Sequence, residues 1–186
     1  MTSLPTSIAD ALEAHESFSP LESDADEADA YTLETTVFET TVIADEAEEP
    51  RDGAFTVGVR LPTLGAATDD HVAPVVEDGW FETFERRLED TFSVAHTSTH
   101  EEPRVERDRD EEIVEVTLEY VAWDANEGVD DAKTLIEYVE GTYAQGIVPG
   151  YSYRGPAATL LENAQQAGAE ATEDNGVDGA DRTGTR

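Results

Sequence analysis

Four histidines and a large excess of carboxylates are the side chains in this chain that could do chemistry. His96 and His100 have the spacing of four residues with which two imidazoles on one helix hold a metal ion. The residues around them favour an extended strand, in which positions four apart lie about 13 Å from each other, so we interpret the two as a strand-surface pair. His15 falls in a predicted helical arm and His71 in a predicted loop. The histidines therefore predict no metal site.

Two acidic stretches, DADEAD from Asp24 and DRDEE from Asp108, begin like the calcium-binding loop of an EF-hand. Such a loop needs glycine at its sixth position, which is occupied by Asp29 in the first stretch and by Ile113 in the second. We interpret both stretches as solvated acidic runs. They are expected to attract monovalent cations without specificity.

The sequence also lacks the motifs that mark an enzyme or a cofactor site. It has no cysteine, which excludes disulfides, thiolate catalysis and cysteine-ligated metals. GxSxG and SxxK motifs, which position a nucleophile, do not occur, and neither do the glycine-rich loops that hold phosphates. Paired carboxylates could act as general acid and base, but 44 candidates single out none. We predict no catalytic residue, no cofactor and no metal.

The charge balance is the strongest compositional feature. Asp and Glu number 44 against 11 Lys and Arg, for a net charge of -33, and Lys133 is the single lysine. Scattered acid and scarce lysine are typical of proteins from the salt-rich cytoplasm of halophilic archaea. Salt suits such a chain because the Debye length falls from about 10 Å at 0.1 M to about 3 Å at 1 M. A rival interpretation is that the acid is itself functional, as in a nucleic-acid mimic or a calcium store.

The same charge constrains partners and location. Binding to nucleic acid or to anionic lipid begins with Lys and Arg on phosphates, so we predict neither a nucleic-acid partner nor a membrane partner. The N-terminal residues MTSLPTSIADALEAHES lack the basic and apolar regions of a signal peptide. No apolar run approaches the length of a membrane span. A cytoplasmic location is expected.

Apolar periodicity predicts an α+β fold with one mainly antiparallel sheet. The sheet is expected to have about four to five strands in two hairpins, with two or three helices on one face, in the order α-β-β-(β)-α-β-β-α-α. One face of the sheet should meet water, because its outward residues are acidic. We divide the chain into a helical arm at 1–16, an acidic linker at 17–29, the α+β domain at 30–167 and a disordered acidic tail at 168–186.

The expected elements follow from the spacing of apolar residues. The first strand, 31–43, slips out of alternation at Phe38, which predicts a bulge or a change of face. Gly146 is expected to end the third helix in a left-handed cap. The elements are strands at 31–43 and 55–61, a connection at 62–76 that could hold a third short strand, a helix from Asp78 to Phe92, strands at 94–99 and 114–120, a helix from Asn126 or Asp130 to Gly146, and a helix from Pro156.

The stretch QGIVPGYSYRGP, residues 145–156, contains two tyrosines and no Asp or Glu. Its Pro149-Gly150 pair predicts a type II turn, with glycine supplying the positive φ. The turn should fold the two following tyrosines back against the preceding helix. Two interpretations stay open: a structural clasp that docks the last helix, or an exposed interaction surface made of Tyr151, Tyr153 and Arg154.

The segment Pro149-Gly150-Tyr151-x-Tyr153, followed by a helix that starts at Pro156, resembles a family of small, acidic haloarchaeal proteins of unknown function. The resemblance covers about residues 4–167 and implies no activity, cofactor or site residue. The order of elements also resembles the small chaperones of type III secretion. That second resemblance is one of fold alone, and it implies binding of protein segments and homodimers.

The leading hypothesis from sequence is a protein- or peptide-binding module without enzymatic activity. It rests on a sheet with one apolar face and on the missing active-site motifs. The first alternative is a small enzyme that uses carboxylates and His96, which a deep pocket around that residue would favour. The second alternative is a structural homodimer joined through Tyr151, Tyr153 or a sheet edge.

Overall fold

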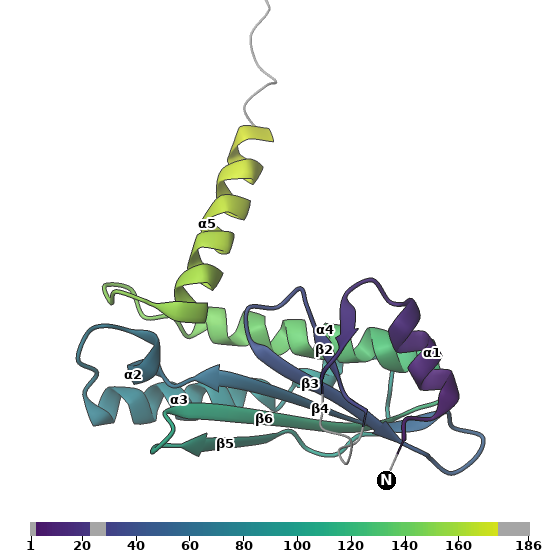
Figure 1. Ribbon diagram of the computed structural model, residues 1–186. Coiled ribbons are helices and arrows are strands. Elements are labelled where there is room, and N and C mark those ends of the chain that lie inside the picture. The colour runs from purple at the N-terminus through teal and green to yellow at the C-terminus, as the bar shows by residue number, and fades with distance from the viewer. Residues whose placement is uncertain (1–2, 23–28, 175–186) are drawn as a thin grey trace, which may run out of the picture.

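The computed structural model describes residues 3–22 and 29–174, with side chains described through residue 170 (Figure 1). An open, fully antiparallel sheet of six strands forms the centre, in the spatial order β1-β2-β3-β4-β6-β5. The α+β fold with one antiparallel sheet is confirmed. The strands are β1 Phe18–Pro20, β2 Tyr31–Leu33, β3 Glu39–Asp45, β4 Gly53–Pro62, β5 Arg104–Asp108 and β6 Ile113–Ala122.

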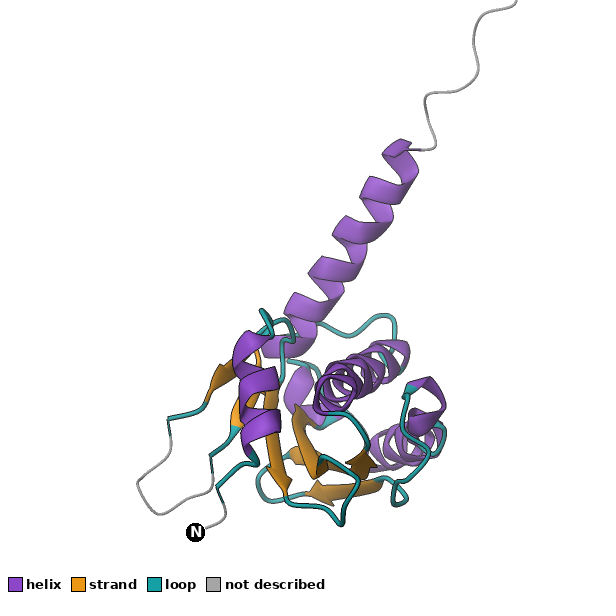
Figure 2. Ribbon diagram, turned by 90° about the vertical axis from the view of Figure 1, so that its right-hand side faces the viewer, coloured by secondary structure: helices purple, strands orange, loops and turns teal. Residues whose placement is uncertain are grey.

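The helices of the described chain pack against one face of this sheet, apart from α5, whose first turns pack on the body and whose later turns project away from it (Figures 1 and 2). The longest of the packed helices, α4, lies across the central strands. The helices are α1 Thr6–Ala14, α2 Leu64–Ala67, α3 Pro74–Leu88, the 3-10 helix η1 Thr91–Val94, α4 Ala125–Gln145 and α5 Gly155–Asp174.

Strict alternation in β4 and β6 builds the core. Inward-facing residues of both strands are buried, whereas the outward-facing positions of the two strands are half-buried or exposed. Helix α4 approaches the sheet closely at Gly128, where a Cβ would lie 2.5 Å from the Phe55 ring. Tyr120 stacks on Phe55 at 5.1 Å and donates its hydroxyl to the Gly128 carbonyl. This position requires glycine because any side chain would push α4 off the sheet.

The N-terminal half departs from prediction at two places. The run 31–43 is not one strand, since β2 and β3 are separated by a turn at 34–38 in which the Glu140 carboxylate of α4 accepts from the Val37 amide. The slip in alternation therefore marks a turn and not a bulge. Within the expected acidic linker, residues 18–20 form β1, because Phe18 is buried and pairs in register with Leu33 of β2. Residues 23–28 of that linker lie outside the described residues.

The connection at 62–76 holds no third strand. It contains α2, whose N-terminus is capped by the Thr63 hydroxyl accepting from the Ala66 amide. The next helix, α3, begins at Pro74 and not at Asp78, because proline suits the first helical turn. Asp78 instead accepts from Arg107 at 2.8 Å and so ties α3 to β5.

The second hairpin is formed by other residues than the predicted ones. The strand predicted at 94–99 is absent there: η1 occupies 91–94, and β5 is Arg104–Asp108. The charges of β5 make it look like a turn in the sequence. Arg107 faces inward all the same, where its guanidinium lies 4.7 Å from the Phe81 ring centroid. Ring contact and ion pairing let an arginine occupy a position that the sequence pattern reserves for an apolar residue.

The C-terminal helices differ from prediction at their ends. Asp124 caps α4, since its carboxylate accepts from the Glu127 amide, so the helix begins before Asn126. Gly146 ends α4 with φ of -84°, so the predicted left-handed cap is wrong. Helix α5 continues through 168–174, where the disordered tail was expected to begin. The remainder of that tail, 175–186, lies outside the described residues.

Candidate functional site

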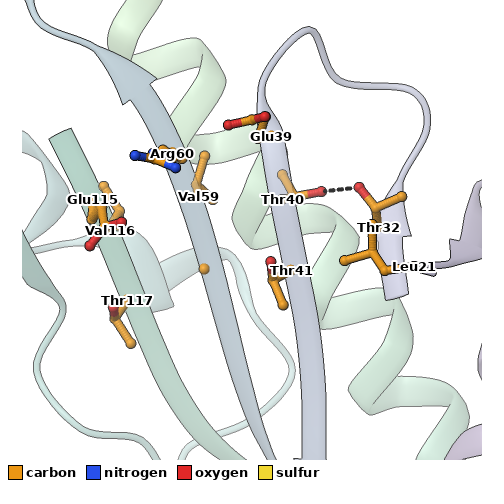
Figure 3. Close-up of a pocket in the computed structure, with 11 residues that line it drawn as sticks. Leu21, Thr32, Glu39, Thr40, Thr41, Val59, Arg60, Glu115, Val116 and Thr117 are labelled. Carbon is orange, nitrogen blue, oxygen red and sulfur yellow. Dashed lines mark hydrogen bonds between the residues drawn. The ribbon is translucent and has the colours of Figure 1, made fainter. Parts of the chain in front are cut away.

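The open face of the sheet carries a hollow of about 490 Å³ over β3, β4 and β6 (Figure 3). Its floor follows one register across the strands, in which Thr41 pairs with Gly58 and Gly58 with Thr117. A Cβ on Gly58 would meet nothing closer than 3.9 Å, so the hollow is deepened by the absence of a side chain at this position. Glu39 and Glu115 flank the hollow.

Most of the residues that line this first hollow are polar. Thr32 and Thr40 share a hydrogen bond of 3.1 Å along one wall, as Figure 3 shows. Arg60 reaches across the face to pair with Glu111. Hydroxyls and carboxylates of this kind form the solvated face expected of an antiparallel sheet that is covered on one side. No histidine lines the hollow, and the lining residues offer no nucleophile beside a base.

A second hollow, which we call the apolar cleft, has a different character. It measures about 340 Å³ and opens between α3, the end of α4 and the loop 147–149. None of its eleven lining residues is Asp or Glu, although the chain has 44 acidic residues among 186. The lining residues are Val76, Gly79, Trp80, Thr83, Phe84, Arg87, Gln145, Gly146, Ile147, Val148 and Pro149.

Stacked aromatic rings form one wall of the apolar cleft. Trp80 lies parallel to Phe84 at 5.7 Å and meets Tyr143 edge-on, also at 5.7 Å. Gly146 lets the indole sit against the end of α4, since a Cβ there would lie 3.0 Å from Trp80 Nε1. The wall is fixed by the core behind it, where Phe84 and Tyr143 are each 2% exposed. A rigid aromatic wall of this kind suits an apolar side chain.

The Trp80 indole N–H is a hydrogen-bond donor without an acceptor in the described part of the chain. Trp80 is 8% exposed, and Nε1 has no hydrogen-bond partner among the described residues. All fully buried polar side-chain atoms in the described part of the chain do have partners, so Nε1 must touch solvent. A tryptophan N–H on a nearly buried ring usually finds an acceptor.

Gly79 keeps the floor of the apolar cleft open. It lies inside α3, and a Cβ there would meet nothing within 4 Å. Glycine inside a helix costs about 1 kcal/mol relative to alanine, so helix stability does not explain it. Next to it along α3, Val75 is 78% exposed and Val76 is 38% exposed. Apolar surface therefore extends from the apolar cleft onto the first turn of α3.

Positive charge at the apolar cleft comes from Arg87, in the last turn of α3, where a cation suits the helix dipole. Arg87 and its neighbour Arg86 make no ion pair with any described residue. Arg51 lies 5.3 Å from the centroid of the Trp123 ring. The other basic side chains in the described part of the chain, those of Arg60, Arg104, Arg107, Arg109, Lys133 and Arg154, all pair with carboxylates.

The predicted turn at Pro149-Gly150 is present, with φ of 96° at Gly150. The Tyr153 hydroxyl folds back, donating to the Val148 carbonyl at 3.0 Å and accepting from the Val148 amide at 2.7 Å. Burial raises the pKa of Tyr153. Because Val148 lines the apolar cleft, Tyr153 holds one wall of the cleft in place.

Arg154 completes the clasp on the side of α2. Its amide donates to the Ala67 carbonyl at 2.8 Å, its Nε donates to the Ala66 carbonyl at 3.0 Å, and its guanidinium pairs with Asp69. Tyr151 is half-buried against the core. Tyr153 and Arg154 therefore have internal partners, which favours the clasp interpretation of this segment. The interaction surface suggested for these residues stays a prediction.

The two histidines with metal-like spacing have separate partners. Asp131, which is 1% exposed, accepts from the His96 amide at 2.7 Å, the Thr97 amide at 3.0 Å and His96 Nδ1 at 2.9 Å. This hydrogen bond raises the pKa of His96, whose side chain is 61% exposed. His100 stacks on Phe92 at 4.0 Å instead. Within the described ranges, no group of three or more potential ligands could hold a metal ion.

The sequence prediction placed Trp80 and Phe84 on the core face of a helix, but it did not find the apolar cleft. Two signals point to the cleft in retrospect. One is Gly79, a glycine inside a helix that it does not stabilise, and the other is the run 141–161, which contains no Asp or Glu and includes the loop 147–149.

Comparison with known proteins gives a family and no function. The model of a family of unknown function, DUF5813, matches residues 13–163. No curated protein matches the chain, and no solved structure does. Among the helices described, none has the length and apolar character needed to cross a membrane.

Proposed function

We propose that this chain, which belongs to the DUF5813 family of unknown function, is a peptide-binding protein without enzymatic activity. The apolar cleft holds a short apolar segment of a partner protein. One observation carries the proposal: an aromatic-lined hollow without a single carboxylate, on a chain with a net charge of -33.

The size and surroundings of the apolar cleft suit a protein segment. Its volume of about 340 Å³ is near the lower end of the range for ligand pockets and holds one or two side chains. The exposed Val75 and Val76 continue the apolar surface along α3, so a segment that crosses the cleft finds further contacts. An exposed apolar patch on an otherwise charged protein marks an interaction site.

Salt adaptation accounts for the acidic surface in this proposal, with the protein acting in the cytoplasm of a halophilic archaeon. The carboxylates are spread along the whole chain, and screening by molar salt relieves their repulsion. The clasp serves the apolar cleft indirectly, since Tyr153 holds Val148. An enzyme built on His96 finds less support, because the imidazole is exposed and its Asp131 partner is engaged by two backbone amides.

Selection from a random peptide library, displayed on phage, tests the proposal against the full chain. The blocking variant is Gly79→Gln, which fills the apolar cleft from within α3. Its matched control is Gly141→Gln, at an exposed position inside α4 where a Cβ also meets nothing within 4 Å. A third variant, Gly58→Val, fills the sheet-face hollow of Figure 3.

We expect apolar peptides to be selected by the wild-type chain, by Gly141→Gln and by Gly58→Val, and to be lost with Gly79→Gln. Loss of binding with Gly58→Val alone would move the site to the open sheet face. Selection of no peptide by the wild-type chain would reject the proposed function.

A further inference from the structure

Resting on the proposed function, we infer that the segment bound in the apolar cleft carries a carboxylate next to its apolar side chain. The carboxylate is held by the guanidinium of Arg87 and the indole N–H of Trp80. Both groups line the apolar cleft, and both lack a partner among the described residues. The partner is therefore an acidic, apolar protein segment.

The ion pairs of the described chain leave Arg87 available for this partner. Six of its basic side chains are neutralised by the chain's own carboxylates, in keeping with an excess of 44 acidic over 11 basic residues. Arg87, like Arg51 and Arg86, makes no ion pair with a described residue, and it lines the apolar cleft, whose lining residues include no Asp or Glu. An arginine left free beside an apolar hollow complements a carboxylate, and it repels a basic segment.

The second donor is independent of the first. Trp80 lines the apolar cleft and is more than nine-tenths buried, with 8% exposure, yet its N–H has no acceptor in the described chain. Tryptophan can only donate, so its partner must present an oxygen. Together, two donors and an apolar wall favour an anionic acceptor over a neutral or cationic one.

Two sources can supply the carboxylate, an Asp or Glu side chain and the C-terminus of the partner. Fluorescence polarisation distinguishes them with labelled peptides built on one apolar pair. In the side-chain arm, Gly-Phe-Leu-Glu-Gly-amide is compared with versions that carry Gln or Lys in place of Glu. In the C-terminal arm, Gly-Phe-Leu with a free carboxyl group is compared with its amide. All peptides carry the label on the N-terminus and are measured at one fixed KCl concentration.

The variants are Arg87→Gln, which removes the guanidinium at the apolar cleft, and Arg86→Gln as the matched control. Arg86 is the neighbouring exposed arginine, has no ion pair and does not line the cleft. For the wild-type chain and for Arg86→Gln, we expect the carboxylate peptide of one arm to bind about three- to fivefold more tightly than its neutral form, as for solvent-exposed ion pairs. The Lys peptide should bind most weakly. Arg87→Gln should lose the preference for the carboxylate peptide.

Equal affinities of carboxylate and neutral peptides for the wild-type chain would overturn the inference and leave the proposed function standing. The same holds if Arg87→Gln keeps the preference. If no peptide binds and the library selection also returns nothing, the proposed function fails, and this inference fails with it.

Discussion

Replacement of Gly79 by glutamine should raise the stability of the fold and weaken peptide binding. Gly79 lies inside α3, and a Cβ built there has no atom within 4 Å, so the first carbon of the new side chain fits without a clash. Beyond Cβ, the glutamine chain extends into the space that Gly79 lines together with Trp80 and Val76. Substitutions that fill a binding site without harming the fold are rare, because most sites need their side chains for packing.

The expected magnitudes have opposite signs. Glycine is about 1 kcal/mol less favourable than alanine inside a helix, and glutamine is close to alanine, so unfolding should cost about 0.5 kcal/mol more. For a chain of this length that raises the midpoint of thermal unfolding by about 1–2 °C. A fully buried apolar side chain contributes about 1.5–3 kcal/mol, so its exclusion from the apolar cleft should weaken binding about tenfold to a hundredfold.

Differential scanning calorimetry and fluorescence polarisation of one selected peptide measure the two effects. Gly141→Gln should show the same gain in stability with unchanged affinity. A Gly79→Gln variant that binds as well as the wild-type chain would refute the assignment of the apolar cleft. A variant that unfolds at a clearly lower temperature would show that the fold itself requires glycine at this position.

Three further predictions concern charge, the clasp and pH. The thermal midpoint should rise steeply between about 0.1 M and 2 M KCl, because the Debye length falls to about 3 Å by 1 M; a midpoint unchanged by salt, followed by circular dichroism, would contradict salt adaptation. Tyr153→Phe removes two hydrogen bonds to Val148, so it should lower the free energy of unfolding, measured by urea titration, by about 1–2 kcal/mol and should also weaken peptide binding. A variant that binds peptide with full affinity would show that the clasp does not support the apolar cleft. The pKa of His96 is raised, so its protonated form stabilises the fold below about pH 6.5, the usual histidine pKa, and this stabilisation is lost as pH rises through the raised value. A His96→Gln variant should lack that part of the pH dependence of stability. If the variant and the wild-type chain have identical pH profiles, the pair with Asp131 does not contribute.

The central strands and the turn of the clasp could be predicted because local patterns determine them. In β4, buried and less buried residues alternate over ten positions, which is the period of a strand with one buried face. The turn at Pro149-Gly150 followed from the fixed φ of proline and the positive φ that glycine permits.

The edges of the sheet were missed because tertiary partners override the local pattern there. The sequence of β5 is typical of a charged turn. It forms a strand because Arg107 contacts the Phe81 ring and pairs with Asp78, both of which lie on α3. β1 has three residues, too few to show a period, and its pairing depends on the burial of Phe18.

The apolar cleft was beyond sequence reasoning for a related reason. Periodicity identifies Trp80 and Phe84 as apolar positions of a helix, but it cannot say that part of their surface stays uncovered. The uncovered surface of these rings depends on the position of the loop 147–149, which is fixed by the hydrogen bonds of Tyr153 to Val148. The pairing state of Arg87 likewise depends on its neighbours in space.

The most direct test of the apolar cleft as the binding site uses the two tryptophans of the chain, Trp80 and Trp123. Each gives one indole N–H signal in a nitrogen-proton correlation spectrum, and Trp123 is 55% exposed and absent from the residues that line the cleft. Titration with a selected peptide should move the Trp80 signal, with saturation at the measured affinity, and leave the Trp123 signal in place. A bound peptide that leaves the Trp80 signal unmoved would contradict the account.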